Sequence, residues 1–207
     1  NTVTCFGLFA SIAAASDGAE LLKQSEIRGG VVVHLGCGDA TVTEQLAGGG
    51  QYLVVGLDTD VTSVAAARQR LRLSGRYGDI TVDQWDGRRL PFIDNFVNLI
   101  VVGTAEQASG EELLRALAPG GVILQKREAR WQKTVKPWPA EMDQWTHYFH
   151  GPGGNPVGRD TLVAPPKRLQ WLGGPGWSRH HDHMASMSAL VSGGGRLCYI
   201  LVEGSRA

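Results

Sequence analysis

Apolar and polar positions alternate in blocks along the first 130 residues of the chain. Short apolar runs rich in β-branched residues, bounded by glycines or polar turns, are typical of buried strands. Such runs lie at 31–33, 52–57, 80–82, 98–102 and 122–125. Apolar residues at helical spacing predict helices at 20–27, 41–46, 61–73 and 111–117. Strands that alternate with helices indicate βαβ units, so we expect an α/β fold with a Rossmann-like, doubly wound, mostly parallel sheet.

The pattern changes after about residue 130. Tryptophan, proline and glycine become dense there, and the helical periodicity ends. Apolar runs at 189–191 and 197–202 flank a glycine-rich segment and predict a β-hairpin. We therefore divide the chain into segments 1–16, 17–130 and 131–207. Beyond this hairpin the last apolar strand has no further partner in the sequence pattern, so we expect the remainder of a longer chain.

The first segment is apolar and then small, and it turns polar at Asp17. Residues 13–15 fit an Ala-x-Ala cleavage site, so the segment resembles the remnant of a secretory signal peptide, although no charged stretch precedes it. A short N-terminal helix fits equally well. The first interpretation predicts export to the periplasm or cell envelope, and the second leaves a cytoplasmic location open. No apolar stretch is long enough to span a membrane.

Charge and cysteine content remove several classes of function. Lys+Arg and Asp+Glu are both 20, so the formal net charge is zero and there is no strong signal for general nucleic-acid binding. The three cysteines, Cys5, Cys37 and Cys198, are too widely spaced for a disulfide framework or a zinc knuckle. We interpret Cys37 as a small packing residue inside a glycine turn.

That turn follows the first predicted strand and opens the next helix. Gly36 and Gly38 lack the Cβ atoms that would keep a nucleotide away from the backbone. Asp58 lies 22 residues beyond Gly36, at the tip of the second strand, where a carboxylate can accept hydrogen bonds from ribose hydroxyls. The dinucleotide fingerprint needs a further glycine where Thr41 stands. The pattern therefore favours a mononucleoside-type ligand over a pyrophosphate.

Segment 33–40 resembles motif I of the class I S-adenosylmethionine-dependent methyltransferases. Segments 55–60, 85–92 and 117–121 resemble three later motifs of that family, in the same order. The resemblance implies a small-molecule cofactor, S-adenosylmethionine, with the acid at Asp86 contacting the adenine amino group. The implied cofactor contacts are His34, Leu35, Gly36, Cys37, Gly38, Asp58, Thr59, Asp86 and Gly87.

The chain departs from the family at several points. His34 and Asn98 stand where acidic residues are usual, and Ala40 replaces the third glycine of motif I. Segment 102–105 carries no known acceptor motif, and the usual elements after the fifth strand are reduced, so neither catalytic residues nor the methyl acceptor are assigned. His34 is a candidate base, but we favour a structural histidine at a strand end. Asp39 either caps the next helix or touches ligand.

The C-terminal third resembles a second family. Segment 142–159 resembles the opening blade of quinoprotein-like (PQQ-like) β-propellers, and segment 165–171 resembles the stretch that follows it. The hairpin would supply the first strands of a blade, and the tryptophans would pack between strands. His181 and His183 could share one face of an extended segment, but without a third ligand we assign no metal site.

Three functional hypotheses follow. The leading one is an S-adenosylmethionine-binding methyltransferase-like domain that transfers a methyl group to an unknown acceptor. The second is a catalytically inactive methyltransferase fold with a structural or binding role beside a propeller; the changes at His34 and Asn98 favour it. Export favours it too, because S-adenosylmethionine is a cytoplasmic metabolite. In the third, the propeller is the functional part and binds a quinone or another protein.

Overall fold

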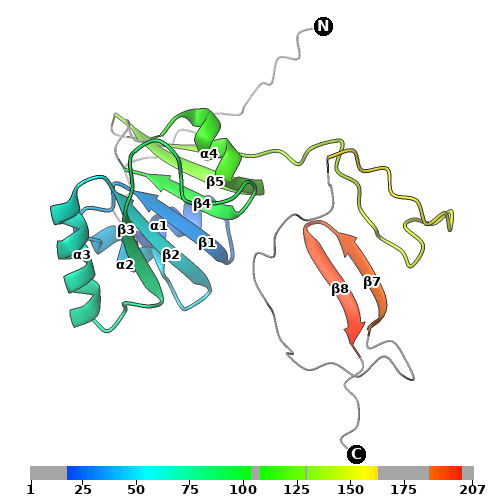
Figure 1. The fold of residues 1–207 in the computed structure, drawn as a ribbon, viewed down its shortest axis with the longest axis horizontal. Coiled ribbons are helices and arrows are strands. Elements are labelled where there is room, and N and C mark those ends of the chain that lie inside the picture. Colours follow the sequence, from blue (N-terminus) through cyan, green and yellow to red (C-terminus); the bar gives the residue numbers. More distant parts are fainter. Residues whose placement is uncertain (1–17, 104–107, 129, 163–186, 202–207) are drawn as a thin grey trace, which may run out of the picture. The chain divides into compact units, whose positions relative to one another are not determined.

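The computed structural model describes residues 18–103, 108–128, 130–162 and 187–201. The chain forms two compact units, 1–137 and 138–207, which are described separately. In the first unit the chain runs through α1 (Gly18–Ser25), β1 (Gly30–Leu35), α2 (Thr41–Leu46), β2 (Tyr52–Asp58), α3 (Val61–Leu73), β3 (Ile80–Gln84), β4 (Val97–Val102), α4 (Gly110–Ala116), β5 (Leu117–Arg127) and β6 (Arg130–Val135) (Figure 1).

The six strands form one sheet in the order β3-β2-β1-β4-β5-β6. All neighbours pair in parallel except β5 and β6, which are antiparallel. From β1 the chain builds outward through β2 to β3, and it then crosses back to place β4 on the other side of β1. This is the strand order of doubly wound dinucleotide-binding folds. The Rossmann-like sheet predicted from the sequence is confirmed.

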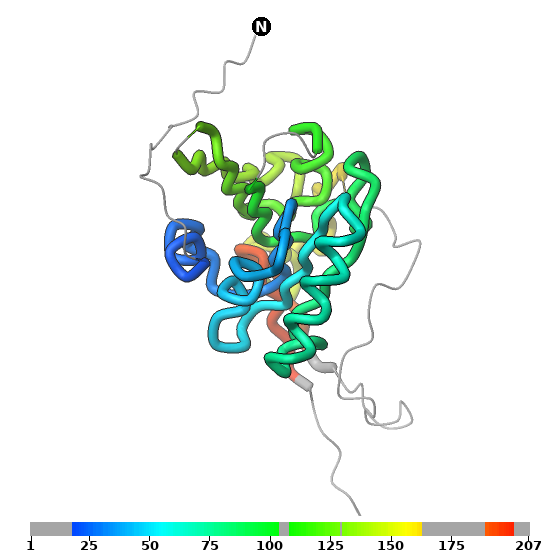
Figure 2. The backbone as a smooth tube through the Cα atoms, turned by 90° about the vertical axis from the view of Figure 1, so that its left-hand side faces the viewer, coloured from blue at the N-terminus to red at the C-terminus, as the bar shows by residue number. Residues whose placement is uncertain are grey.

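Reversal of strand order at β1 places the connecting helices on opposite faces of the sheet. One core lies under α1, α2 and α3 and contains Leu21, Leu46 and Leu71. The other lies under α4 and the loop before β4, and it contains Leu90 and Leu113. Figures 1 and 2 show α3 and α4 on opposite sides of the strands. Because both faces are covered, the strands read as continuous apolar runs.

Strand β5 begins earlier than the sequence suggests. The sequence predicts a helix at 111–117 and a strand at 122–125, but α4 ends at Ala116 and β5 follows at once at Leu117. The pairing with β4 shifts register between Val97 and Leu99, so the proline–glycine segment forms an irregular stretch within the strand. Gly120 has a φ of 76°, and its N–H donates to the carbonyl of Lys136 at 2.8 Å.

Strand β6 was not predicted, and all of it except Arg130 lies in the segment 131–207. Trp131 is its one buried residue, with 5% of its surface exposed, and it joins the core under α1. A strand with one apolar inward position lacks the alternation that marks strands in a sequence. The first compact unit, which contains β6, extends to Pro137.

The second unit contains one two-stranded antiparallel sheet in its described part. It is the predicted hairpin, with β7 (Met187–Gly193) and β8 (Arg196–Leu201) joined at Gly194 and Gly195, both at positive φ. Before it, the Asp143 carboxylate contacts His150 Nε2 at 2.6 Å and accepts the N–H of Arg159. Segments 1–16 and 165–171 and the histidines at 180–183 lie outside the described residues. No described helix is long and apolar enough to cross a membrane.

Candidate cofactor site

The candidate site lies where β1, β2 and β3 end, at the carboxyl edge of the sheet. Strand order reverses beside β1, and ligands of open α/β sheets bind in the crevice at such a switch point. The predicted residues gather there because the pairing of β1 with β2 and of β2 with β3 is parallel and in register: Leu35 lies opposite Leu57, and Asp58 lies opposite Gln84.

The glycine turn after β1 is held against the end of β2 by its own backbone. The Gly36 N–H donates to the Leu57 carbonyl at 2.8 Å, and the Ala40 N–H donates to the Cys37 carbonyl at 2.9 Å. Gly36 and Gly38 have φ of 70° and 54°, where a side chain is strained. A Cβ on Gly38 would meet no atom within 4 Å. The backbone at Gly38 is therefore open, as a close approach by a ligand would require.

Asp58 is nearly buried at the tip of β2, and backbone amides orient its carboxylate. Oδ2 accepts the N–H of Gly38 at 2.9 Å, and Oδ1 accepts the N–H of Asp60 at 3.0 Å. One carboxylate thus ties the glycine turn to the start of α3. A carboxylate oxygen accepts more than one hydrogen bond, so each oxygen keeps acceptor capacity for a ligand hydroxyl.

His34 is a buried histidine bonded to a neighbouring helix. Its Nδ1 lies 2.8 Å from Thr43 Oγ1 on α2, and its ring is 5% exposed. Burial lowers the pKa of His34 to about 4, against the opposing effect of Asp58. The imidazole is therefore neutral at pH 7 and a weak proton acceptor. This geometry agrees with the structural role favoured from the sequence.

Leu35 and Cys37 face the interior. The Leu35 side chain is fully buried in the core under α4, so only its backbone is available, and its carbonyl accepts the N–H of Gly103 at 3.3 Å. Burial raises the pKa of the Cys37 thiol to about 12, with Asp58 adding to the effect. A thiol held in this form packs rather than reacts. A Cβ on Gly56 would come within 3.0 Å of Cys37 Cβ, so Cys37 fills the space beside that glycine.

The second part of the site is the turn after β3. The Trp85 N–H donates to the Asp58 carbonyl at 3.1 Å, which places the turn beside β2. Asp86 Oδ1 accepts the N–H groups of Arg88 and Arg89 at 2.9 and 3.2 Å, and these bonds lower the pKa of the exposed carboxyl group. Gly87 has a φ of 76°, and a Cβ there would lie 3.4 Å from Thr59.

Two other residues from the sequence interpretation form hydrogen bonds within the protein. Asp39 accepts the Thr41 N–H at 3.0 Å and the Thr41 hydroxyl at 2.7 Å, so its carboxylate supports the start of α2. Asn98 stands at the opposite edge of the sheet, near the amino end of β4, where Oδ1 accepts the N–H of Val31 at 2.9 Å. The change at Asn98 therefore does not bear on the cofactor edge.

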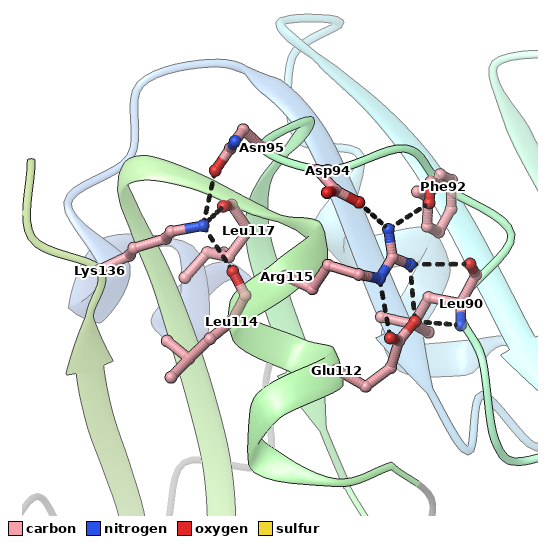
Figure 3. Close-up of polar contacts among 9 residues, drawn as sticks. All are labelled: Leu90, Phe92, Asp94, Asn95, Glu112, Leu114, Arg115, Leu117 and Lys136. Carbon is pink, nitrogen blue, oxygen red and sulfur yellow. Dashed lines mark hydrogen bonds and ion pairs between the residues drawn. The ribbon is translucent and has the colours of Figure 1, made fainter. Parts of the chain in front are cut away.

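Sequence reasoning missed a polar network that holds the loop between the Asp86 turn and β4 (Figure 3). Arg115 forms two bonds with Glu112, one bond with Asp94, and bonds with the carbonyls of Leu90 and Phe92. Opposite charges three residues apart in the predicted helix at 111–117 were a visible signal for the Glu112–Arg115 pair. Nothing in the sequence indicated that the pair also contacts the loop before β4.

Comparison with known proteins finds similarity within the first unit. Residues 32–121 match the family model described as a methyltransferase domain. The ubiquinone/menaquinone biosynthesis C-methyltransferase UbiE of Blochmanniella floridana is 30% identical over 113 residues, which cover 50% of this chain and 44% of that protein. The chain therefore spans less than half the length of this relative.

Solved structures of similar chains include the YcgJ protein of Bacillus subtilis, with 23% identity and a TM-score of 0.45. That match covers 52% of this chain and 49% of the other. Another is the geranyl diphosphate C-methyltransferase of Streptomyces coelicolor A3(2), solved with S-adenosyl-L-homocysteine, with 18% identity, a TM-score of 0.46, and coverage of 52% and 43%.

The matched segment begins within β1 and ends within β5, so it contains the glycine turn, Asp58 and the Asp86 turn. The sequence resemblance and the family match agree on this part of the chain. Together with the fold, they support a class I methyltransferase-like domain.

Proposed function

We propose that the first unit binds S-adenosylmethionine at the carboxyl edge of its sheet and transfers the methyl group to an acceptor. The observation that carries the proposal is the bond between the Gly38 N–H and Asp58 Oδ2 at the switch point of the sheet. It combines an open glycine backbone with an oriented carboxylate, and these are the two features that a ribose needs for close approach and hydrogen bonding.

In this proposal, the turn at Asp58 contacts the ribose of the cofactor and the turn at Asp86 contacts its base. Asp58 offers its remaining acceptor capacity to ribose hydroxyls, and Thr59 and Gly87 border the path to the base. Asp86 lies beyond them, where its exposed carboxylate can accept a hydrogen bond from the adenine amino group. When bound, S-adenosylmethionine supplies an electrophilic methyl group, so the protein needs mainly to align the acceptor with it.

His34 gives weak support to base catalysis. Its low pKa and its bond to Thr43 make it a poor proton acceptor at neutral pH, so the proposed reaction uses an acceptor that needs no strong base. The same observation favours a second candidate function, a domain that binds the cofactor without turnover. A methyl-transfer assay separates the two functions.

Calorimetric titration of the full chain with S-adenosylmethionine and S-adenosylhomocysteine tests binding. We expect saturable heat with wild type and at least a tenfold weaker affinity for Asp58→Ala, because hydrogen bonds to charged groups contribute roughly 1.5–3 kcal/mol. Asp83→Ala is the matched control, since Asp83 is an exposed acid on β3 that pairs with Arg68. Absence of heat with wild type at millimolar ligand would exclude the proposed function. If binding is present, formation of S-adenosylhomocysteine with candidate acceptors decides between the enzyme and the binding domain.

For the second unit we propose a partial blade of a quinoprotein-like β-propeller that binds a quinone. An open pocket of about 580 Å³, lined by aromatic residues and by the hairpin, supports this proposal. Trp145, Tyr148 and Phe149 supply its flat apolar surfaces. Quenching of tryptophan fluorescence by pyrroloquinoline quinone, reduced in Trp145→Phe, is the expected result. Equal quenching of both proteins would contradict the proposal.

A further inference from the structure

The loop before β4 connects the Asp86 turn to a charged pair on α4. Glu112 and Arg115 lie one turn apart on the helix and form a bidentate contact, with Nε and Nη2 of Arg115 at 2.8 and 2.6 Å from the two carboxylate oxygens. Both side chains are mostly buried, at 14% and 20% exposed. An arginine in this fork geometry is held more firmly than a single point charge would be.

The Glu112–Arg115 pair bonds with both N–H and carbonyl groups of the loop before β4. Glu112 Oε1 accepts the Leu90 N–H at 2.7 Å, while Arg115 Nη2 donates to the Leu90 carbonyl at 3.2 Å. Arg115 Nη1 donates to the Phe92 carbonyl at 2.9 Å and to Asp94 at 2.6 Å. Figure 3 shows the guanidinium surrounded by these loop groups. Leu90 is therefore held by both its N–H and its carbonyl, in addition to its buried side chain.

Hydrogen bonds hold the chain on both sides of the Asp86 turn. On one side, the Trp85 N–H is bonded to the Asp58 carbonyl. On the other side, the Arg88 and Arg89 amides that orient the Asp86 carboxylate immediately precede the anchored Leu90. Only one or two planar peptide units join Leu90 to these amides, so fixing Leu90 limits the positions that the amides can take.

We propose that Glu112 and Arg115 are positioning residues that aim Asp86 at the base of the nucleoside and thereby set the preference for a 6-amino group. This inference rests on the proposed function. A carboxylate accepts a hydrogen bond from the amino group of adenine, and it opposes the 6-oxo group of hypoxanthine because both are acceptors. The pair acts only through the turn, so its loss alters base preference more than general affinity.

The experiment compares S-adenosylhomocysteine with S-inosylhomocysteine, which carries a 6-oxo group, by calorimetry on the full chain. We expect wild type to prefer the adenine ligand by about tenfold to a hundredfold, the range for a charged hydrogen bond. Asp86→Ala should abolish most of this ratio. Arg115→Met should reduce the ratio at least fivefold, with a smaller change in affinity for the inosine ligand.

Lys136→Met is the matched control. Lys136 also holds this region, through Asn95 and the carbonyls of Leu114 and Leu117 (Figure 3). Its contact with the loop is at Asn95, nine residues beyond Asp86 in the sequence. The Lys136→Met variant should have a lower melting temperature and an unchanged ratio of the affinities for the adenine and inosine ligands. An equal loss of ratio in Arg115→Met and Lys136→Met would overturn the inference, as would an unchanged ratio in either Arg115→Met or Asp86→Ala.

Glu112→Gln keeps the inference testable if Arg115→Met fails to fold. Glutamine retains an oxygen for the Leu90 N–H but loses the charged contact with Arg115, so a partial loss of the ratio is expected. A Glu112→Gln protein that is folded and has the wild-type ratio would overturn the inference. Wild type that binds neither ligand would exclude the proposed function, and a wild-type preference unaffected by the pair would leave that function intact.

Discussion

At the scale of single residues, the candidate site combines a glycine, Gly38, with a nearly buried carboxylate, Asp58. Gly38 presents an N–H to Asp58 and open space to the outside, and no residue with a Cβ provides that space without strain at its φ. Asp58 is almost buried, yet both of its oxygens accept backbone N–H groups. Its orientation is consequently set before any ligand arrives, which reduces the ordering cost of binding.

Gly38→Ala should separate ligand approach from stability. The left-handed backbone predicts a loss of about 1 kcal/mol in the free energy of unfolding. Cofactor affinity should fall at least tenfold, because the new methyl group enters the space of the nucleoside. Urea unfolding and calorimetry measure the two effects.

Gly75→Ala is the control for this change, since Gly75 has a φ of 70° and open surroundings at the end of α3. It should show the same loss of stability with unchanged affinity. Equal affinity losses in the two variants would refute the role of the open backbone at Gly38.

His34 predicts a dependence of stability on pH. Its pKa falls from about 6.5 to about 4 on folding, so the unfolded chain binds more protons between these values. Its contribution is complete above pH 6.5 and is lost as pH falls towards 4, by up to about 3 kcal/mol. His34→Gln should flatten the dependence of the urea midpoint on pH between 4.5 and 6.5. A wild-type slope retained in this variant would contradict the assignment to His34.

At the scale of elements, α4 is a short helix with two tasks. Its inner face packs Leu113 and Ala116 on the sheet, and Glu112 and Arg115 hold the loop before β4. Isolated helices of this length are unstable in water, so packing and capping maintain α4. Ser109 is its N-cap and accepts the Glu112 N–H at 3.2 Å.

Ser109→Ala should lower the free energy of unfolding by about 1 kcal/mol through loss of the cap. Ser109→Asp keeps an acceptor at the same position and should remain within about 0.5 kcal/mol of wild type. Chemical denaturation of the three proteins tests this. Indistinguishable stability of the alanine variant and wild type would show that the cap contributes nothing.

At the scale of the whole first unit, the sheet is covered on both faces. We expect the loss of stability on substitution to depend on how deeply each side chain is buried between these layers. Leu99 on β4 is fully buried, whereas Leu53 on β2 is 64% exposed. Leu99→Ala should cost about 3 kcal/mol by lost burial and cavity formation. Leu53→Ala should cost less than about 0.5 kcal/mol. Urea unfolding decides the matter, and similar losses in the two variants would contradict the packing described.

The predictable part of the molecule is the part that rests on local chemistry. Helices at 41–46 and 61–73 have the bounds of α2 and α3, because apolar spacing and flanking turn residues are local signals. The site at Gly36, Gly38 and Asp58 was predicted because parallel strands bring their carboxyl ends to one edge. Strand β6 was missed because its single inward residue, Trp131, leaves no period to detect.

The sequence alone establishes the buried strands, the glycine turn and the acidic strand tip, since period and backbone freedom are properties of neighbouring residues. Folding adds what depends on distant partners. It removes Asn98 from the cofactor edge, neutralises His34 by burial, and joins Arg115 to the loop that carries Asp86. These outcomes follow from which faces meet and which groups lose water, and such contacts between residues far apart in the chain leave no periodic signal.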